Sequence, residues 1–172
     1  MARKQKEIEQ DEEEMSEQES VNVLEMLKED HQKVQELFEQ FENADGRSRQ
    51  GIVEEALKEL EIHTKIEETL VYPAIREAIE EEETVDEANE EHHVVTLLSK
   101  ELRKMKGSAD GYRAKFKVLS ELVKHHIEEE ETEMFPQAEQ AEIDWEEIGQ
   151  EAMKIKERMM KQKGASGHRR AA

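Results

Sequence analysis

Two stretches of the chain repeat the same order of residue types that bind metal ions. In each, a histidine is followed by two adjacent glutamates and then by an aromatic–proline pair: His63, Glu67, Glu68, Tyr72 and Pro73 in the first, and His126, Glu130, Glu131, Phe135 and Pro136 in the second. The histidine and the first glutamate are four residues apart in both, so they are stacked neighbours on one face of a helix. An imidazole and a carboxylate in that arrangement can bind one metal ion together.

A further histidine precedes each stretch on an upstream segment. His31 follows Asp30, and His92 follows Glu91. The sequence therefore predicts a doubled helical hairpin in which each half supplies two histidines and one glutamate.

Apolar residues recur at intervals of three and four around these positions, as on the buried face of a helix. Each predicted stripe is interrupted near its middle by the histidine or glutamate. The stripes are Leu24, Leu27, His31, Val34, Phe38 and Phe41; Val53, Ala56, Leu60, His63, Glu67 and Leu70; Val85, Ala88, His92, Val95, Leu98 or Ser99, and Leu102; and Tyr112, Phe116, Leu119, Val123, His126 and Glu130.

Carboxylates on these stripes would be buried, which is costly unless a cation is present. An unpaired buried carboxylate costs several kcal/mol, so Glu67 and Glu130 together would cost about 10 kcal/mol. That is comparable to the roughly 5–15 kcal/mol of net stability of a whole domain. Lysine and arginine are absent from the stripes near these positions, so a metal is the remaining candidate. Four imidazoles and two carboxylates exceed one tetrahedral zinc. They suit two ions of higher coordination number, with iron or manganese first.

Turn and capping residues divide the chain into helices. We expect a first helix capped by Ser20 and ending near Asn43, and a second from Ser48 with a kink or stop near Pro73. A third begins at the Thr84–Glu87 capping box and ends at Lys106-Gly107, and a fourth runs from about Tyr112 to Glu133. A fifth begins at the Asp144–Glu147 capping box and ends at Lys163-Gly164.

The expected fold is all-α: an up-down-up-down four-helix bundle with an additional C-terminal helix. Charged residues make up 41% of the 172 residues and aromatic residues 4%, which does not suit a sandwich or an α/β fold. Short connections favour antiparallel neighbours. We divide the chain into an acidic disordered tail (1–19), the bundle (20–137), and a C-terminal amphipathic helix with a mobile tail (138–172).

Composition excludes several classes of function. The net charge of −20 repels nucleic acids and anionic membranes. The absence of cysteine excludes disulfides, thiolate metal sites and thiol chemistry. No stretch approaches the length of a membrane span, and the N-terminus lacks the apolar run of a secretory signal. We therefore expect a cytoplasmic protein that binds neither nucleic acid nor membrane.

Taken together, these motifs resemble the hemerythrin-like family, also called the HHE cation-binding domain. The resemblance covers about residues 22–137 and rests on the Asp-His and Glu-His starts, both His-x-x-x-Glu-Glu repeats and both aromatic–proline endings. It implies a non-haem di-iron centre bridged by carboxylates and an oxo or hydroxo species. Carried over residue by residue, the implied ligands are His31, His63, Glu67, His92, His126 and Glu130, with both glutamates bridging.

One departure from the family pattern bears on function. Oxygen-carrying hemerythrins have a second histidine one turn after the first on the third helix, where this chain has Thr96. The resemblance implies binding of two iron ions and a small ligand, oxygen, nitric oxide or peroxide, in sensing, storage or stress response. Alternatives are a di-iron oxidase, peroxidase or nitric oxide reductase, an iron-handling protein, or a metal-free acidic adaptor. We favour a binding or sensing protein over an enzyme.

Residues beside the candidate ligands need separate assignment. His93 and His125 are next to ligand histidines, but one helical step rotates a side chain by about 100°, so we expect them at the surface. Glu68 and Glu131 lie off the stripes, and solvated surface is favoured over hydrogen bonding to a ligand. We expect Tyr72 and Phe135 to close one end of the core.

The fifth helix carries an apolar stripe of its own: Trp145, Ile148, Ala152, Ile155 and Met159. We slightly favour packing of this stripe onto the bundle. The alternative is a surface for self-association or for a protein partner.

Overall fold

The computed structural model describes residues 21–46, 48–79 and 82–167, and every regular element in these ranges is helical. In chain order these are α2 (Val23–Asn43), α3 (Ser48–Ile66), η1 (Glu67–Val71), α4 (Tyr72–Ile79), α5 (Glu82–Leu102), α6 (Tyr112–Glu129), η2 (Glu130–Met134), α7 (Phe135–Ala138) and α8 (Trp145–Gly167). The predicted tail at 1–19 and the last five residues, 168–172, lie outside the described residues.

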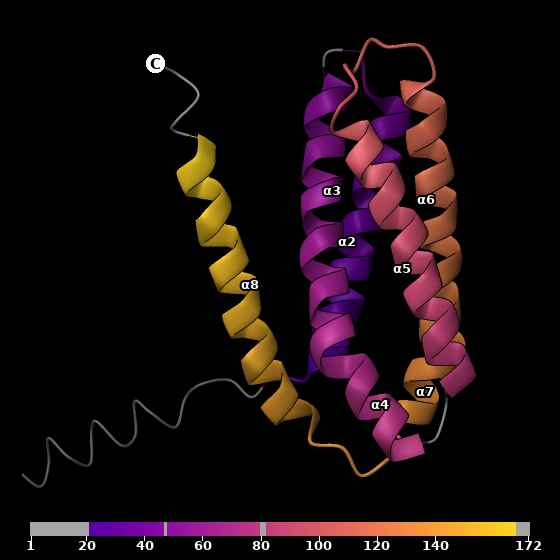
Figure 1. Ribbon diagram of the computed structural model, residues 1–172, viewed down its shortest axis with the longest axis vertical. Helices are drawn as coiled ribbons and strands as arrows, with labels where there is room; N and C mark the ends of the chain where they lie inside the picture. The colour runs from indigo at the N-terminus through magenta and orange to yellow at the C-terminus, as the bar shows by residue number, and fades with distance from the viewer. Residues whose placement is uncertain (1–20, 47, 80–81, 168–172) are drawn as a thin grey trace, which may run out of the picture.

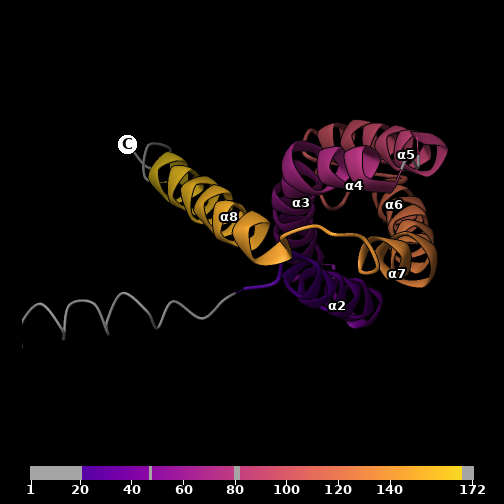
Figure 2. The same ribbon diagram turned by 90° about the horizontal axis from the view of Figure 1, so that it is seen from below.

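The elements form the expected antiparallel bundle with an added C-terminal helix (Figure 1). α2 packs mainly on α3, and α5 packs mainly on α6. Seen along the bundle, α2, α3, α5 and α6 surround a common centre, and α8 lies outside them (Figure 2). The predicted all-α fold class is confirmed.

The core consists of two apolar clusters. One gathers around Leu24, Ile66, Tyr72 and Phe135. The other gathers around Phe38, Phe41 and Phe116 toward the opposite end of the bundle. Along α2 the first cluster includes Leu27 and the second includes Val34, with buried His31 between them. The layer of buried polar side chains that includes His31 therefore lies between the two apolar clusters, which fix the spacing of the helices around it.

Short polar side chains start three of the helices. Asn22 Oδ1 accepts hydrogen bonds from the backbone N–H of Leu24 and Glu25, so α2 is capped by Asn22 and not by Ser20 as we expected. Asp45 caps α3 through the N–H of Ser48 at 2.8 Å. Asp144 caps α8 through the N–H of Glu147 at 2.9 Å, which confirms the predicted start of that helix.

The bounds predicted for the third helix are wrong at both ends. α5 has already begun at Glu82, so Thr84 lies inside it. Glutamate is a good helix former and suits the first turn electrostatically, so the helix extends past the capping box. At the other end α5 stops at Leu102 rather than at Lys106. Just beyond Leu102, the backbone N–H groups of Lys104 and Met105 bond to carbonyls three residues back, those of Glu101 and Leu102, so the chain turns more tightly than an α-helix. α8, in contrast, runs beyond the predicted Gly164 to Gly167.

A π-helical turn begins at each of the two candidate ligand glutamates, Glu67 and Glu130. The N–H of Tyr72 donates to the carbonyl of Glu67, and the N–H of Phe135 donates to that of Glu130, five residues back in each case. Pro73 and Pro136 follow directly; proline lacks an N–H and its ring clashes with the preceding turn. The wider turn absorbs that clash, so the helix continues through Pro73 instead of stopping. It also shifts the helical register, which leaves Leu70 only half-buried where we predicted a core position.

The apolar stripe of α8 packs on the bundle, as the favoured interpretation predicted. Trp145 and Ala152 are buried in the first cluster, and Ile148, Ile155 and Met159 pack against it. α8 packs mainly on α2, α3 and η1. A partner surface on this helix stays a prediction, and its exposed large apolar residues are Met153 and Met160.

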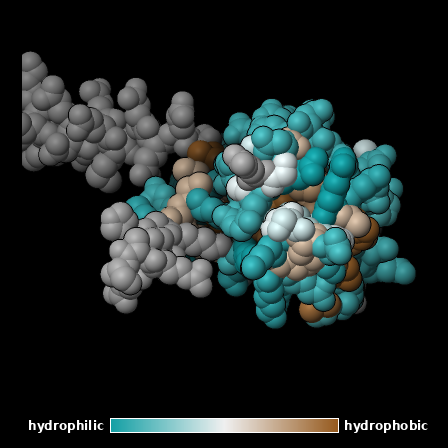
Figure 3. All heavy atoms as spheres, turned by 90° about the horizontal axis from the view of Figure 1, so that it is seen from above, coloured by the Kyte–Doolittle hydropathy of each residue, from teal (hydrophilic) through white to brown (hydrophobic). Residues whose placement is uncertain are grey.

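The end of the bundle that carries the α2–α3 and α5–α6 connections is mostly hydrophilic at its surface (Figure 3). Within the described ranges, no helix is both long enough and apolar enough to cross a bilayer.

The docking of α8 depends on one close approach of backbone to backbone. A Cβ added at Gly149 would lie 1.7 Å from the carbonyl oxygen of Val21, whereas one added at Gly51 meets nothing within 4 Å. We predict that Gly149→Ala displaces α8 and destabilises the protein by about 1–3 kcal/mol. Gly51→Ala, the matched control, should stabilise it by about 0.5–1 kcal/mol.

Urea unfolding measures both variants. Fluorescence of Trp145, the single tryptophan, reports on α8 docking. Equal stability of the two variants would show that the approach to Val21 does not hold α8.

Candidate metal centre

The structure brings the six candidate ligands together in the middle of the bundle. His31 comes from α2, His63 from α3, Glu67 from η1, His92 from α5, His126 from α6 and Glu130 from η2. All six are buried. Their ligating atoms form two groups, one of His31, His63, Glu67 and Glu130, and the other of Glu67, His92 and His126.

The four imidazoles form two pairs. The Nε2 atoms of His31 and His63 are 3.1 Å apart, and those of His92 and His126 are 3.0 Å apart. Two nitrogen ligands at about 2.1 Å from one ion and at right angles to each other would be separated by about 3.0 Å. Each pair therefore has the spacing of two ligands of a single ion.

The two glutamates lie between the histidine pairs. Glu67 Oε1 is 2.9 Å from His63 Nε2, and its Oε2 is 3.4 Å from His92 Nε2. Glu130 Oε2 is 3.2 Å from His31 Nε2 and 3.5 Å from His126 Nε2. Each carboxylate thus contacts one histidine of each pair, which is the placement of a bridging ligand.

Buried oxygen atoms at the centre lack hydrogen-bond partners. Both carboxylate oxygens of Glu67 and Oε2 of Glu130 are fully buried, and no described protein group donates a hydrogen bond to them. Buried carboxylate oxygens are normally satisfied. These free lone pairs face imidazole nitrogens at ion-pair distance. Such a set of nitrogen and oxygen donors suits bound cations better than an ordinary core without metal.

Carboxylates outside the centre hold three of the four imidazoles through Nδ1. Glu131 Oε1 lies 2.8 Å from His31 Nδ1, Glu68 Oε1 lies 3.3 Å from His92 Nδ1, and Glu91 Oε2 lies 2.6 Å from His126 Nδ1. Such contacts fix the ring orientation and raise its basicity.

The solvated-surface interpretation of Glu68 and Glu131 is therefore wrong. Both side chains are partly exposed but reach inward to a buried imidazole ring, Glu131 to His31 and Glu68 to His92. The doubled glutamate in both repeats was a usable signal for them. Glu91 was missed, although it immediately precedes His92.

Tyr72 also belongs to the centre and does not merely close the end of the core. Its hydroxyl donates to Glu130 Oε1 at 2.8 Å, and it lies 3.3 Å from His92 Nε2 and 3.4 Å from His126 Nε2. The side chain is almost fully buried. Burial raises the pKa of this phenol well above its usual value, and the nearby charges of Glu130 and Glu67 raise it further. Phe135, at the equivalent place in the second repeat, stacks on His31 with ring centroids 6.0 Å apart.

Protons balance the buried charge in the metal-free protein. Burial, reinforced by the charge of Glu130, raises the pKa of Glu67 to about 8, so this carboxyl holds its proton at neutral pH. Burial would also raise the pKa of Glu130, but the charge of His126 and the close contact with His31 lower it below its usual value. One carboxylate is therefore charged and the other neutral.

The histidines divide in a similar way. Burial opposes the charged form of His126, but the charge of Glu130 and the hydrogen bond to Glu91 outweigh it and raise the pKa to about 9. Burial lowers the pKa of His63 to about 3, and the charge of His31 adds to that shift. His63 is thus neutral, whereas His126 is a cation in the absence of metal.

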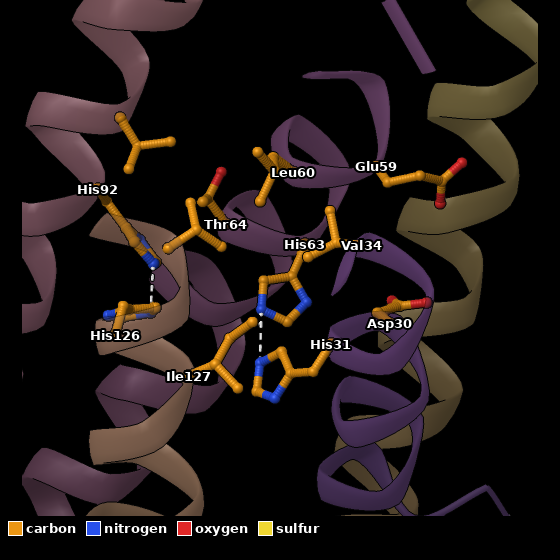
Figure 4. Close-up of a pocket in the computed structure, with 12 residues that line it drawn as sticks. Asp30, His31, Val34, Glu59, Leu60, His63, Thr64, His92, His126 and Ile127 are labelled. Atoms are coloured by element: carbon orange, nitrogen blue, oxygen red, sulfur yellow. Dashed lines mark hydrogen bonds between the residues drawn. The ribbon is translucent and has the colours of Figure 1, made fainter. Parts of the chain in front are cut away.

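Apolar side chains cover the centre on one side. A cavity of about 20 Å³ is lined by all four histidines (Figure 4). Its apolar lining is Val34, Leu60, Val95, Val123 and Ile127, and Asp30, Glu59 and Thr64 complete it. This face of the site is therefore largely apolar.

His93 and His125 lie outside the centre, as the helical geometry predicted. His93 is exposed. His125 is at the surface, 3.3 Å from Glu129. Thr96 lines a groove between α3 and α5 and is not part of the centre.

Comparison with known proteins places the chain in a family. The family model described as the hemerythrin HHE cation binding domain matches residues 22–138. The chain belongs to this family, and its buried His/Glu cluster fits a metal-binding hemerythrin-like protein.

Two individual proteins are similar. The crystal structure of a hemerythrin HHE cation binding domain-containing protein from Mycobacterium kansasii superposes with a TM-score of 0.67 at 29% identity, covering 86% of this chain and 91% of that one. A DNA nickase from Nostoc sp. is 26% identical over 121 residues, which are 70% of this chain. The chain spans about a third of the length of that nickase, 34%.

The proton balance predicts an unusual pH dependence for the metal-free protein. Glu67 and His126 both have a folded-state pKa above the unfolded value, about 8 and about 9. The folded state therefore binds more protons, and stability falls as pH rises from about 6.5 to 9. His63, with its lowered pKa, contributes no change in this window because its unfolded form is already neutral above about 6.5.

We expect the melting temperature of chelator-treated protein to fall over this range. Glu67→Gln should melt higher than the wild type at pH 9, because the neutral amide cannot ionise in the core. A melting temperature that stays level or rises between pH 6.5 and 9 would contradict the assignment of these protons.

Proposed function

We propose that the protein binds two iron ions and a small ligand, oxygen or nitric oxide. The ligands would be His31, His63, Glu67, His92, His126 and Glu130, with both glutamates bridging. The observation that carries the proposal is the placement of two carboxylates between two histidine pairs, each pair spaced at 3.0–3.1 Å.

The donor types favour iron among the common metals. The set is nitrogen and oxygen only, since the chain has no cysteine. Imidazole mixed with carboxylate suits iron and manganese in five- or six-coordinate sites. Six protein ligands shared by two such ions would leave coordination positions open, where bound iron would be able to take up a diatomic ligand.

Tyr72 would complete the second site. Its hydroxyl lies close to His92 and His126, the pair whose helix has Thr96 where an oxygen carrier has a histidine. The phenol either gives a further oxygen donor to this ion or, by keeping its proton, holds Glu130 through the 2.8 Å hydrogen bond. In both cases it makes the two sites inequivalent.

The protein's own side chains would control what happens to the ligand. The apolar wall, which includes Val34, Leu60, Val95 and Val123, keeps water away from the open positions. Glu131, Glu68 and Glu91 hold the imidazoles in place. Such a centre suits sensing, storage or a stress response. A net charge of −20 opposes binding to phosphates, which argues against DNA nicking by this chain.

Metal analysis with an absorption spectrum tests the proposal. Protein purified in air should contain two irons per chain and show the near-ultraviolet charge-transfer bands of ferric ions sharing an oxygen bridge. His63→Ala should lose both the metal and the bands. His93→Ala, which removes an exposed neighbour of a ligand, should keep both. A full complement of iron in His63→Ala would contradict the ligand assignment.

Tyr72→Phe separates the two roles of the phenol. We expect iron to be retained, because six ligands remain, but the spectrum to change. A phenolate on ferric iron would give a visible band that Tyr72→Phe removes. If the visible region is the same in both proteins, Tyr72 acts by hydrogen bonding to Glu130.

A turnover assay separates binding from catalysis. With hydrogen peroxide or nitric oxide as substrate, a binding or sensing protein should turn over no faster than free iron. Sustained turnover that is lost in His63→Ala would instead favour the peroxidase or nitric oxide reductase alternative.

A further inference from the structure

One ligand imidazole lacks the outer partner that the other three have. His31, His92 and His126 each face a carboxylate through Nδ1, at 2.8, 3.3 and 2.6 Å. His63 Nδ1 is buried and has no hydrogen-bond partner among the described protein atoms. A buried ring N–H without an acceptor is costly, so a nearby acceptor is to be expected.

The internal repeat indicates which residue that acceptor is. The first histidine of each half has its carboxylate partner in the other half: His31 contacts Glu131, and His92 contacts Glu68. His126, the second histidine of its half, takes the residue before His92, which is Glu91. The equivalent residue for His63 is the one before His31, namely Asp30.

Asp30 lies in the place that this equivalence requires. Asp30 and His63 line the same cavity, and the Nδ1 edge of the His63 ring faces the side on which Asp30 lies (Figure 4). Aspartate is one methylene shorter than glutamate, by about 1.5 Å, so it stops short of the ring that a glutamate would reach. The cavity of about 20 Å³ exceeds the roughly 10–15 Å³ that one water molecule needs.

The proton of His63 is on the nitrogen that needs this acceptor. His63 Nε2 lies 3.1 Å from His31 Nε2 and 2.9 Å from Glu67 Oε1, so Nε2 is the ring nitrogen that faces the centre. A neutral imidazole that uses Nε2 as an acceptor or as a metal ligand carries its hydrogen on Nδ1.

Lys156 of α8 holds Asp30. Its Nζ lies 2.5 Å from Asp30 Oδ1, and both side chains are largely buried. The two residues are 126 positions apart, and Lys156 lies beyond the residues that the family model matches. The neighbouring Lys154 bonds only to exposed Glu151 of its own helix in the structure.

We propose that Asp30 is a positioning residue for His63. It accepts the Nδ1–H of His63 through one bridging water, and Lys156 keeps its carboxylate in that place. The C-terminal helix is thereby coupled to one ligand of the metal centre. Glu59 also lines the cavity, but Lys33 holds it at 3.0 Å, and the second half has Leu122 at the equivalent position.

Ring nitrogen NMR of the metal-free protein tests the hydrogen bond directly. The wild type should show His63 protonated at Nδ1, with that proton protected from exchange. Asp30→Ala should shift the Nδ1 signal of His63 and speed its exchange, while the signal of His31, which Glu131 holds, stays in place. Glu29→Ala, at an exposed neighbouring position, should change neither.

Two more substitutions keep the test decisive if Asp30→Ala folds poorly. Asp30→Glu restores the length that Glu91 has, so the His63 signal should move toward that of a direct bond. Lys156→Met should weaken the protection of His63, Lys156→Arg should restore it, and Lys154→Met should leave it unchanged.

Metal affinity provides a second readout, and this part rests on the proposed function. Loss of an outer partner of a ligand lowers metal affinity by about 10- to 100-fold. We expect ferrous affinity about tenfold lower for Asp30→Ala and close to wild type for Glu29→Ala. If no variant binds iron, the proposed function fails, while the NMR measurement on metal-free protein still decides the hydrogen bond.

The proposal is overturned if Asp30→Ala and Lys156→Met both leave the His63 signal at its wild-type position. It is also overturned if Glu59→Ala, and not Asp30→Ala, moves that signal.

Discussion

Two carboxylates at the centre of the bundle are the constraint on which the rest of the structure depends. Glu67 and Glu130 are essentially fully buried, and part of their hydrogen-bonding capacity is unused. A folded domain tolerates this only if positive charge lies beside them. Without metal, protons on Glu67 and His126 supply the balance. Metal ions would replace these protons, so binding and deprotonation are one process.

The rest of the bundle supports the buried His/Glu cluster from both sides. The apolar clusters above and below it hold the helices at fixed separation, so the imidazoles meet in pairs. The π-helical turns come directly after the two glutamates and absorb the prolines that follow. The repeat in the sequence also produces a repeat in the hydrogen bonding. The first histidine of each half bonds to a glutamate of the other half, His31 to Glu131 and His92 to Glu68. The halves differ at two equivalent positions near the centre. The first half has Tyr72 where the second has Phe135, and it has Asp30 where the second has Glu91.

Much of this could be predicted from the sequence, because the chemistry follows helical periodicity. Spacing of three and four residues selected His92 over His93 and His126 over His125, and the structure places them accordingly. The outer partners were harder to predict, since Glu68 and Glu131 lie off the buried stripe and reach inward only through long side chains. Tyr72 was misjudged because the π-helical turn rotates it into the centre, and no local propensity predicts that turn. The start of α5 was misplaced because glutamate propensity outweighed a capping motif.

We propose that two metal ions bind among the six buried side chains and displace the protons that Glu67 and His126 hold in the metal-free protein. The most direct measurement is an anaerobic titration of metal-free protein with ferrous iron in weak buffer at neutral pH, recording bound iron and released protons together. The account predicts saturation at two ions per chain, with protons released as the ions bind, and a lower affinity at more acidic pH. Saturation at one ion, or binding without proton release, would contradict it.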